Sequence, residues 1–322
     1  MSMQRRILLS TLLATPALAQ PAWPERPVRI VVPDGAGGGN DTTARVFAMQ
    51  LERVFNLGFP VDNRAGGGGR IGVEHVYRSA PDGATLLLGN AGSNGINGAL
   101  YRDLPYDLTA DFTPISLLVT GPNALAVNPK ELPARDVPEL LRLLRARPAG
   151  SVNYASAGPG SSAHFSMELF KAMTGLDLTH VPYRGAAAMA QAAQAGDTPI
   201  LIANLVNIQP LIARGDLRLL AVTSRERWPG TPDVPTLHES GLEGYETLAW
   251  NGLFGPPGLS PAIGQRLLPE LRRIATLPEV RSRIAAIGGT LVVSDPATLT
   301  ERVRADVAKW RRLADQAGIR PE

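Results

Sequence analysis

Along most of this chain, short runs of apolar residues alternate with segments in which apolar positions recur every three or four residues. The run from Val28 to Val32 is rich in β-branched residues and bounded by two prolines, which predicts a buried strand. A glycine-rich turn follows, and we expect a helix capped by Asn40 or Asp41 after it. The apolar face of that helix would carry Ala44, Phe47, Ala48, Leu51, Val54 and Phe55.

The same order of elements is repeated further along the chain. Short apolar strands are predicted at 85–88, 152–155, 200–203 and 217–223. Helices with a clear apolar face are predicted at 137–145, 186–195, 263–275 and 299–317. Strands that alternate with helices indicate α/β layers built on a mostly parallel sheet.

Small polar residues follow several of these predicted strands. In parallel α/β sheets, ligands bind outside the carboxyl ends of the strands, where loops lead into helices. The turn from Gly37 to Asp41 could hold a carboxylate, because amides at a helix start lack partners and carry partial positive charge. A single loop of this kind can also be a tight turn that only closes a βα unit. The second loop, from Ser156 to His164, favours an anion site.

The run from Gly67 to Gly72 matches the dinucleotide fingerprint G-x-G-x-x-G. We reject a nucleotide site because no clear strand precedes the run. About twenty residues on, the chain has Asn90 in place of the acid that would bind a ribose.

Ser161, Ser162 and His164 suggest the alternative of a hydrolase. The sequence contains no G-x-S-x-G nucleophile elbow and does not indicate an acid that would orient the histidine. Serines at a helix start are more often caps, so we favour a cap or a ligand contact. The other histidines lack metal-ligand spacing, so neither a metal nor a cofactor is predicted.

Three further residues could belong to a ligand site. Arg184, next to Tyr183, stands at a predicted strand end and could bind a carboxylate with both arms of its guanidinium. A solvated surface arginine is an equally good interpretation. Trp250 could line a cleft or fill the core, and the core is the simpler interpretation.

The first residues resemble an export signal. Arg5 and Arg6 precede an apolar run at 7–13, and Ala17-Leu18-Ala19 fits a cleavage site. The run falls short of the about 20 residues that a membrane span needs. The paired arginines fit an ordinary signal and only loosely a twin-arginine signal. Cleavage of 19 residues from 322 would leave 303, enough for two domains.

Composition narrows the classes of protein. The formal net charge is +3, and it falls to +1 without Arg5 and Arg6. Basic and acidic residues are interspersed, which argues against a nucleic-acid partner. The chain has no cysteine, so it has no site for a lipid anchor. We therefore expect a free protein of the periplasm that is not embedded in the membrane.

The chain resembles the periplasmic solute receptors of tripartite tricarboxylate transporters, also called the Bordetella uptake family. The resemblance covers essentially the whole chain after the signal, in family order. It is carried by VPDGAGGGND (32–41), NRAGGGGRIG (63–72), APDGATLL (80–87), LPYDL (104–108), NYASAGPGSSAH (153–164), HVPYRG (180–185), LAVTS (220–224) and DVPTL (233–237).

The resemblance implies a two-lobed periplasmic binding protein fold of type II-like topology. Each lobe would be a mostly parallel sheet flanked by helices, and the ligand cleft would lie between the lobes. We expect lobe 1 at 24–122 plus 249–322 and lobe 2 at 123–248. The implied ligand is a small organic carboxylate: a dicarboxylate, an aromatic acid, or an amino or hydroxy acid. The implied partner is a two-component inner-membrane permease, and the receptor would act as a monomer without catalysing a reaction.

The contacts carried over by position are backbone and side-chain groups of the glycine loop and of three later loops. They are Gly37, Gly38, Gly39, Asn40, Asp41, Ser93, Ser161, Ser162 and Asn204. The remaining candidate ligand-binding residues are Asp34, Ala36, Asn90, Gly158, His164, Tyr183, Arg184 and Trp250.

This sequence departs from the family pattern at Asp34, Ala36, Ala203 and Asn251. An aspartate near the ligand would repel a dianion. One hypothesis is that Asp34 accepts a hydrogen bond from an ammonium or hydroxyl group of the ligand. The alternative is that Asp34 points away from the cleft, as exposed aspartates commonly do.

Two other functions remain open from the sequence. A receptor of this kind can act as a ligand sensor for a signalling partner, and an exported hydrolase is the third possibility. The sequence does not name the carboxylate, the permease or the export route.

Overall fold

The computed structural model describes residues 23–319; the predicted signal segment and its cleavage site lie outside this range. The first part of the described chain contains β1 (Arg29–Val32), α1 (Gly39–Phe55), β2 (Val61–Asn63), a 3-10 turn (Gly67–Gly69), α2 (Arg70–Tyr77), β3 (Thr85–Asn90), a π-helical turn (Ala91–Ile96), α3 (Asn97–Leu100) and β4 (Thr113–Val127). The middle part contains α4 (Val137–Arg145), β5 (Asn153–Ser156), α5 (Ser162–Thr174), β6 (Thr179–Pro182), α6 (Ala186–Ala195), β7 (Ile200–Asn204), α7 (Leu205–Ala213) and β8 (Arg218–Val222). The last part contains β9 (Leu248–Gly255), α8 (Pro261–Thr276), α9 (Pro278–Ala286), β10 (Thr290–Leu291) and α10 (Pro296–Ala317).

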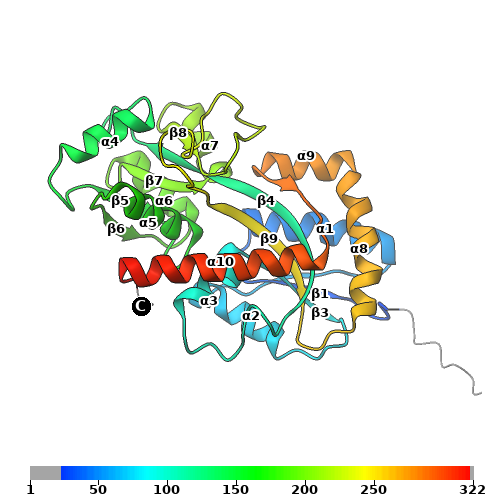
Figure 1. The fold of residues 1–322 in the computed structure, drawn as a ribbon. Helices are drawn as coiled ribbons and strands as arrows, with labels where there is room; N and C mark the ends of the chain where they lie inside the picture. The colour runs from blue at the N-terminus through cyan, green and yellow to red at the C-terminus, as the bar shows by residue number, and fades with distance from the viewer. Residues whose placement is uncertain (1–22, 320–322) are drawn as a thin grey trace, which may run out of the picture.

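One curled sheet runs through the molecule in the order β2-β1-β3-β9-β4-β7-β5-β6, and β8 and β10 also pair with β4 (Figure 1). The long strand β4 pairs with β9 as far as Pro122 and with β7 from Asn123 onwards. The two halves of the sheet therefore meet at these two residues of β4. The outer strands of each half pair in parallel, whereas β4 and β9 pair antiparallel with all their neighbours. The sheet is thus mixed, and the expected parallel arrangement holds only for its outer strands.

Helices cover both faces of each half, and each face has its own apolar cluster. In the first half, residues of α1, α8 and α9 pack on one face, and residues of α2 and α10 pack on the other. In the second half, α4 and α5 contribute to one cluster, and α6 and α7 contribute to another. Each half therefore buries its own core, which confirms the two-lobed α/β fold.

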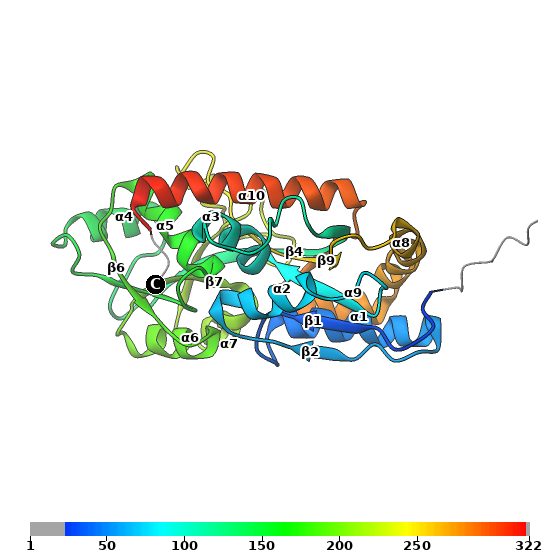
Figure 2. The same cartoon turned by 90° about the horizontal axis from the view of Figure 1, so that it is seen from below.

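Helix α10 spans both halves of the molecule (Figure 2). Near its start, Leu299 and Val303 lie in the same cluster as Trp250 of β9. Near its end, the ring of Trp310 meets the ring of Phe165 of α5 edge to face, with centroids 5.7 Å apart. One helix therefore packs against both halves of the molecule.

Local predictions succeeded for most elements and failed at two points. The helices expected at 137–145 and 186–195 have those bounds in the structure. The predicted cap of the first helix was wrong, because α1 begins at Gly39 and its N-cap, Gly38, has no side chain to cap it. The prediction that no clear strand precedes Gly67 was also wrong, since the three-residue strand β2 ends at Asn63.

Candidate functional site

The loop after β1 exposes glycine backbone at the start of a helix. Residues 35–38 are exposed, and the left-handed backbone of Gly37 (φ 86°) turns the chain toward α1. The amide of Gly37 donates to Oδ2 of Asp41 at 2.9 Å. Because Gly38 brings no side-chain cap, the first amides of α1 keep their hydrogen-bonding capacity for another acceptor. These amides are therefore available to an acceptor from outside the helix.

The charge of Asp41 is balanced within the loop. Its two oxygens accept hydrogen bonds from Nε of Arg45 at 3.0 Å each. Burial by itself would raise the pKa of Asp41, but the hydrogen bonds from Arg45 and from the amide of Gly37 lower it overall. Asp41 is therefore ionised and neutralised by its neighbour, and its role is to shape the first turn.

Asp34 lies in a network of asparagine side chains. Its Oδ2 accepts hydrogen bonds from Nδ2 of Asn40 at 2.5 Å and of Asn90 at 3.1 Å. Nδ2 of Asn251 donates to Oδ1 of Asn40 at 2.8 Å, and Nδ2 of Asn63 donates to the backbone carbonyl of Asp34 at 3.2 Å. We call Asp34, Asn40, Asn90 and Asn251 the amide network. Burial raises the pKa of Asp34, and the two asparagine bonds offset this only in part.

The loop after β3 is held by its own side chains. Oδ1 of Asn90 accepts from the amides of Gly92 and Ser93, both at 2.9 Å. Oγ of Ser93 accepts from the amide of Asn90 at 3.1 Å and donates to Oδ1 of Asn94 at 2.7 Å. Ser93 is only 2% exposed. Its side chain therefore fixes the loop, and Asn90 turns its amide nitrogen toward Asp34.

The glycine run from Gly67 to Gly72 has a packing role. A Cβ atom on Gly72 would lie 2.8 Å from Cα of Pro33, and one on Gly69 would lie 2.9 Å from Cβ of Ser93. Both distances are shorter than a normal contact between carbon atoms, and the neighbouring atoms belong to the backbone or lie next to it. Any residue larger than glycine would therefore clash at positions 69 and 72. The run from Gly67 to Gly72, which matched a dinucleotide fingerprint, therefore packs against the loops after β1 and β3.

The loop after β5 ends in a serine cap. Oγ of Ser161 accepts from the amide of His164 at 3.3 Å, which confirms the expected cap, and Ser162 is the first residue of α5. The ring Nδ1 of His164 accepts from the amide of Gly160 at 3.4 Å. Burial, with smaller contributions from the charges of His180 and Lys171, lowers the pKa of His164 to about 3. Within residues 23–319, the His164 ring forms no hydrogen bond with the hydroxyl of Ser161 or Ser162, so these three residues do not form the serine–histidine pair of a hydrolase.

The loops of the two halves approach each other. A Cβ atom on Gly92 would lie 3.6 Å from the carbonyl oxygen of Gly160. Asn97 lies beside this contact, with its Nδ2 donating to the carbonyl of Gly68 at 2.8 Å. Its Oδ1 is buried and, within the described part of the chain, has no hydrogen-bond partner. Asn97 was missed by the sequence analysis, because nothing in this glycine-rich run distinguishes it from Asn94.

A small pocket lies where the two halves of the sheet meet. It brings together the predicted residues Gly39, Asn40, Asn204 and Trp250. It is also lined by residues that the sequence did not indicate, namely Thr43, Val119, Thr120, Gly121, Ala249, Asn251, Ile287, Gly288 and Gly289. Strands β4, β7 and β9, the start of α1 and the turn before β10 thus converge at one place. Only Asn251 among the missed residues had been singled out, as a departure from the family.

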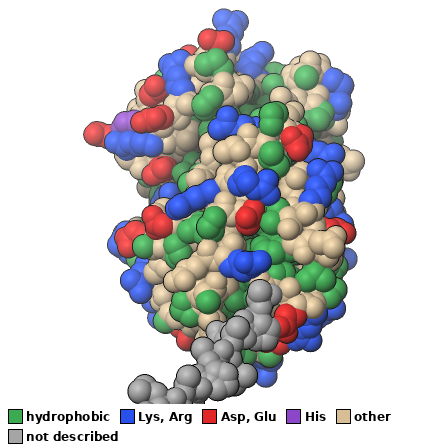
Figure 3. Space-filling view, turned by 90° about the vertical axis from the view of Figure 1, so that its right-hand side faces the viewer, with side chains coloured by type: hydrophobic (Ala, Val, Ile, Leu, Met, Phe, Trp, Pro, Cys, Tyr) green, Lys and Arg blue, Asp and Glu red, His purple; other side chains and the backbone are tan. Residues whose placement is uncertain are grey.

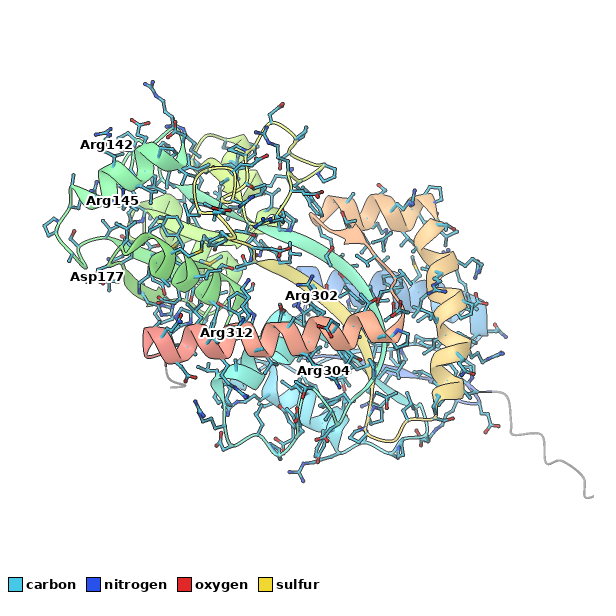
Figure 4. All side chains as sticks on the ribbon, in the orientation of Figure 1. Arg142, Arg145, Asp177, Arg302, Arg304 and Arg312 are labelled. Carbon is cyan, nitrogen blue, oxygen red and sulfur yellow. The ribbon has the colours of Figure 1, made fainter. Side chains whose placement is uncertain are left out.

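Trp250 both lines this pocket and belongs to the core. Its side chain is 2% exposed, and Nε1 donates to Oδ2 of Asp306 in α10 at 2.6 Å. Nη1 of Arg302 lies 3.7 Å from Oδ1 of Asp306. Arg302 is labelled on α10 in Figure 4. Helix α10 therefore fixes the tryptophan at the junction of the halves.

Some predicted residues lie at the edge of this arrangement. Ala36 is exposed on the loop after β1. The amide of Tyr183 donates to the carbonyl of Ser156 at 3.0 Å, so the loop after β6 packs beside Gly158. Arg184 is exposed and, among residues 23–319, forms no ion pair. The pocket at the junction does not include these three residues.

Comparison with known proteins identifies relatives of this arrangement. Residues 43–319 match the model of the tripartite tricarboxylate transporter family receptor. A solved structure of Rpa4515 from R. palustris with adipate is 36% identical, with a TM-score of 0.85 over 93% of this chain and 100% of that one. MatC from Rhodopseudomonas palustris with bound malate is 31% identical, with a TM-score of 0.81 over 90% and 99%. The periplasmic binding protein BugD is 30% identical, with a TM-score of 0.82 over 93% and 100%.

None of the helices between residues 23 and 319 is long and apolar enough to cross a membrane. The two-lobed fold, the convergence of strand-end loops at its centre and the match over residues 43–319 agree with one another. The chain belongs to the receptor family of tripartite tricarboxylate transporters, whose solved members include periplasmic binding proteins.

Proposed function

We propose that this protein is a periplasmic receptor that captures a small organic carboxylate. The observation that carries the proposal is the uncapped start of α1, where the backbone amides of an exposed glycine loop adjoin the pocket between the two halves. Helix N-termini favour anions because of their free amides and their dipole. Two similar proteins, with adipate and with malate, are consistent with this choice of ligand.

The ligand would be held mainly by the backbone amides of residues 38–41, and Ser161, Ser162 and Asn204 would contact it from the other half. Lobe 1 would comprise 24–122 and 249–322, and lobe 2 would comprise 123–248. The two lobes would close about β4 and β9, the strands at which the halves meet. Closure would bring the Ser161 loop over the anion.

We infer that the loaded receptor delivers its ligand to a two-component membrane permease and catalyses no reaction. The name of the family supports the first inference. The acidic and basic side chains on the face shown in Figure 3 are interspersed, and we assign no nucleic-acid partner. Export would remove residues 1–19, and the mature protein would act as a monomer. A sensor that presents the same closed form to a signalling protein is the alternative.

The test is a thermal-shift screen of the mature protein against mono-, di- and tricarboxylates, aromatic acids and amino acids, followed by calorimetric titration. A ligand at 100 times its dissociation constant should stabilise the fold by about 2.7 kcal/mol. Denatured protein is examined by mass spectrometry for a ligand retained from expression. The proposal fails if no carboxylate-bearing compound binds and none is retained. Turnover of a chromogenic ester that disappears in Ser161→Ala would favour a hydrolase instead.

A further inference from the structure

Asp34 is a carboxylate that the protein does not neutralise. Within residues 23–319, no arginine, lysine or histidine forms an ion pair with it. Nearby charges are already paired, since Arg45 binds Asp41 and Arg64 binds Asp62 at 2.9 Å. The partners of Asp34 are the neutral amides of Asn40 and Asn90. A half-buried anion without a cation is costly unless something else supplies the positive charge.

The two oxygens of Asp34 are used unequally. Oδ2 accepts both asparagine bonds, whereas Oδ1 accepts no hydrogen bond from the described residues. An ionised carboxylate offers about four acceptor positions, so the free oxygen retains capacity for a donor from outside. Asn40, Asn63 and Asn90 hold the side chain and backbone of Asp34 from three elements, which fixes the direction of this oxygen.

Asp34 also stands next to the proposed anion site. Asn40, which touches Asp34, belongs to the first turn of α1 and lines the pocket at the junction. Asn40 thus links the carboxylate of Asp34 to the start of α1, where the helix amides carry partial positive charge. This pair of opposite charges complements a small molecule that carries both a carboxylate and a cation.

We propose that Asp34 binds a positively charged nitrogen of the ligand, so that the protein selects amino acids or other aminocarboxylates. This inference rests on the proposed carboxylate receptor function. A hydroxyl group could also donate to Oδ1, but it would leave the charge of Asp34 unbalanced. A second carboxylate would be repelled, which excludes simple dicarboxylates as preferred ligands.

The contrasting possibility is that Asp34 is protonated and donates to a carboxylate, since burial raises its pKa. The variant Asp34→Asn distinguishes an ionised Asp34 that binds a cation from a protonated Asp34 that donates to a carboxylate. Asparagine has nearly the same shape, can still accept from Asn40 and can donate as a protonated acid does. It cannot bind an ammonium group as a counterion.

The experiment compares wild type, Asp34→Asn and a control, Asp103→Asn, by titration calorimetry at pH 7. Asp103 is an exposed aspartate in the loop after α3, and its substitution removes the same charge outside the amide network. The ligands are sets with one carbon skeleton, such as propanoate, lactate and alanine, or glutarate, 2-hydroxyglutarate and glutamate. Unliganded thermal midpoints show that each variant is folded.

We expect the amino member of the set that fits the cleft to bind at least tenfold more tightly than its unsubstituted or hydroxy partner in the wild type. Asp34→Asn should lose at least tenfold in affinity for that amino compound and gain affinity for the dicarboxylate, because bonds to charged groups are strong. Asp103→Asn should match the wild type. A ligand retained from expression should contain a basic nitrogen.

The inference is overturned if the preferred or retained ligand is a nitrogen-free carboxylate, and in that case the receptor proposal stands. It is also overturned if Asp34→Asn binds the amino compound as tightly as the wild type. If no compound of any set binds and none is retained, the receptor proposal itself has failed. These results are distinguishable from one another.

Discussion

The loops after β1 and β5 are built on one plan and end differently. Each follows a buried parallel strand, is rich in small residues and leads into a helix. Helix α1 starts at a bare glycine cap, whereas Oγ of Ser161 satisfies an amide of α5. The first amides of α1 have no side-chain acceptor at the cap. In α5, by contrast, the amide of His164 donates to Oγ of Ser161. The two loops thus differ in the residue at the helix cap, glycine in one and serine in the other.

The side chains behind the two loops differ in the same sense. Behind the first, Asp34 and its asparagines hold a polar group with an unused oxygen. Behind the second, the rings of His164 and His180 stack at 4.0 Å, and Tyr154 stacks on His180 at 4.9 Å. The hydroxyl of Tyr154 donates to Glu168 at 2.5 Å, which in turn pairs with Lys171. The second loop therefore rests on a closed aromatic and ionic cluster, which holds the backbone behind it in place.

The largest effect on ligand affinity is expected when α1 receives a side-chain cap, as α5 has in Ser161. Gly38 has extended backbone (φ −83°, ψ 176°) and room for a side chain, so Gly38→Asp should fold and cap α1. Its carboxylate would occupy the amides and repel the ligand. We expect at least a hundredfold loss of affinity by calorimetry, with an unliganded thermal midpoint equal to or above that of the wild type.

Gly38→Ala is the matched control, since it fills the same space without an acceptor. Its affinity should stay within about tenfold of the wild type. Equal affinity of Gly38→Asp and the wild type would show that the ligand does not use the start of α1.

The next effect tests the support beneath the first loop. Gly72→Ala places a Cβ atom against Pro33 and 3.0 Å from the carbonyl oxygen of Arg64. Overpacking against backbone should lower the free energy of unfolding by about 2–3 kcal/mol, measured by urea denaturation. Gly264→Ala is the control, because Gly264 lies in α8 with open space around it, and it should stabilise the protein by up to about 1 kcal/mol. Equal stability of the two variants would contradict the packing role of the glycine run.

The aromatic cluster behind the second loop predicts a pH effect. The pKa of His164 is about 3 in the folded protein, below the 6.5 of the unfolded chain. The unfolded state therefore binds a proton first as the pH falls, and stability is lost below about pH 6.5 with a slope that approaches 1.4 kcal/mol per pH unit. Between pH 6.5 and 5, this should cost the wild type about 1–2 kcal/mol.

His164→Gln should be less stable than the wild type at pH 7, because it loses the ring stacking, but its stability should depend less on pH above 5. Below that range, carboxylates begin to titrate and mask the histidine. Urea denaturation at pH 7, 6 and 5 measures the free energy of unfolding of the wild type and of His164→Gln. Parallel pH profiles for the two proteins would mean that His164 binds a proton as readily when folded as when unfolded.

Local pattern was sufficient to predict several helices and strands, but it missed the short outer strand β2. Apolar periodicity depends on neighbours in sequence, so α4 and α6 were predicted at their observed bounds. The antiparallel centre was not predicted, because it depends on pairs such as Pro122 with Leu248, which lie far apart in the chain. The resemblance to a family supplied the two lobes that local pattern could not.

The site shows the same limit. The glycine loop was found from its composition, but its cap was misplaced, because Asn40 and Asp41 turn their side chains to Asp34 and Arg45 instead of capping the helix. The partners Asp34 and Asn90 stand 56 residues apart, so only the fold reveals their contact. Gly288 and Gly289 lack side chains, and nothing in their sequence marks them as pocket residues.

The smallest effect on stability and affinity is expected for a substitution in the second loop, at Ser161. Ser161→Ala removes the cap of α5 and should lower the free energy of unfolding by about 1 kcal/mol. The substitution also frees the amide of His164, which could then donate to the ligand. It removes, however, the proposed contact between the Ser161 hydroxyl and the ligand. We therefore expect an affinity loss of less than about tenfold, well below that of Gly38→Asp. Ser161→Asp, which keeps a cap, should restore stability and weaken carboxylate binding further by repulsion. If Ser161→Ala instead weakened binding as much as Gly38→Asp, the two loops would contribute equally to the anion site, and the distinction drawn from their caps would be wrong.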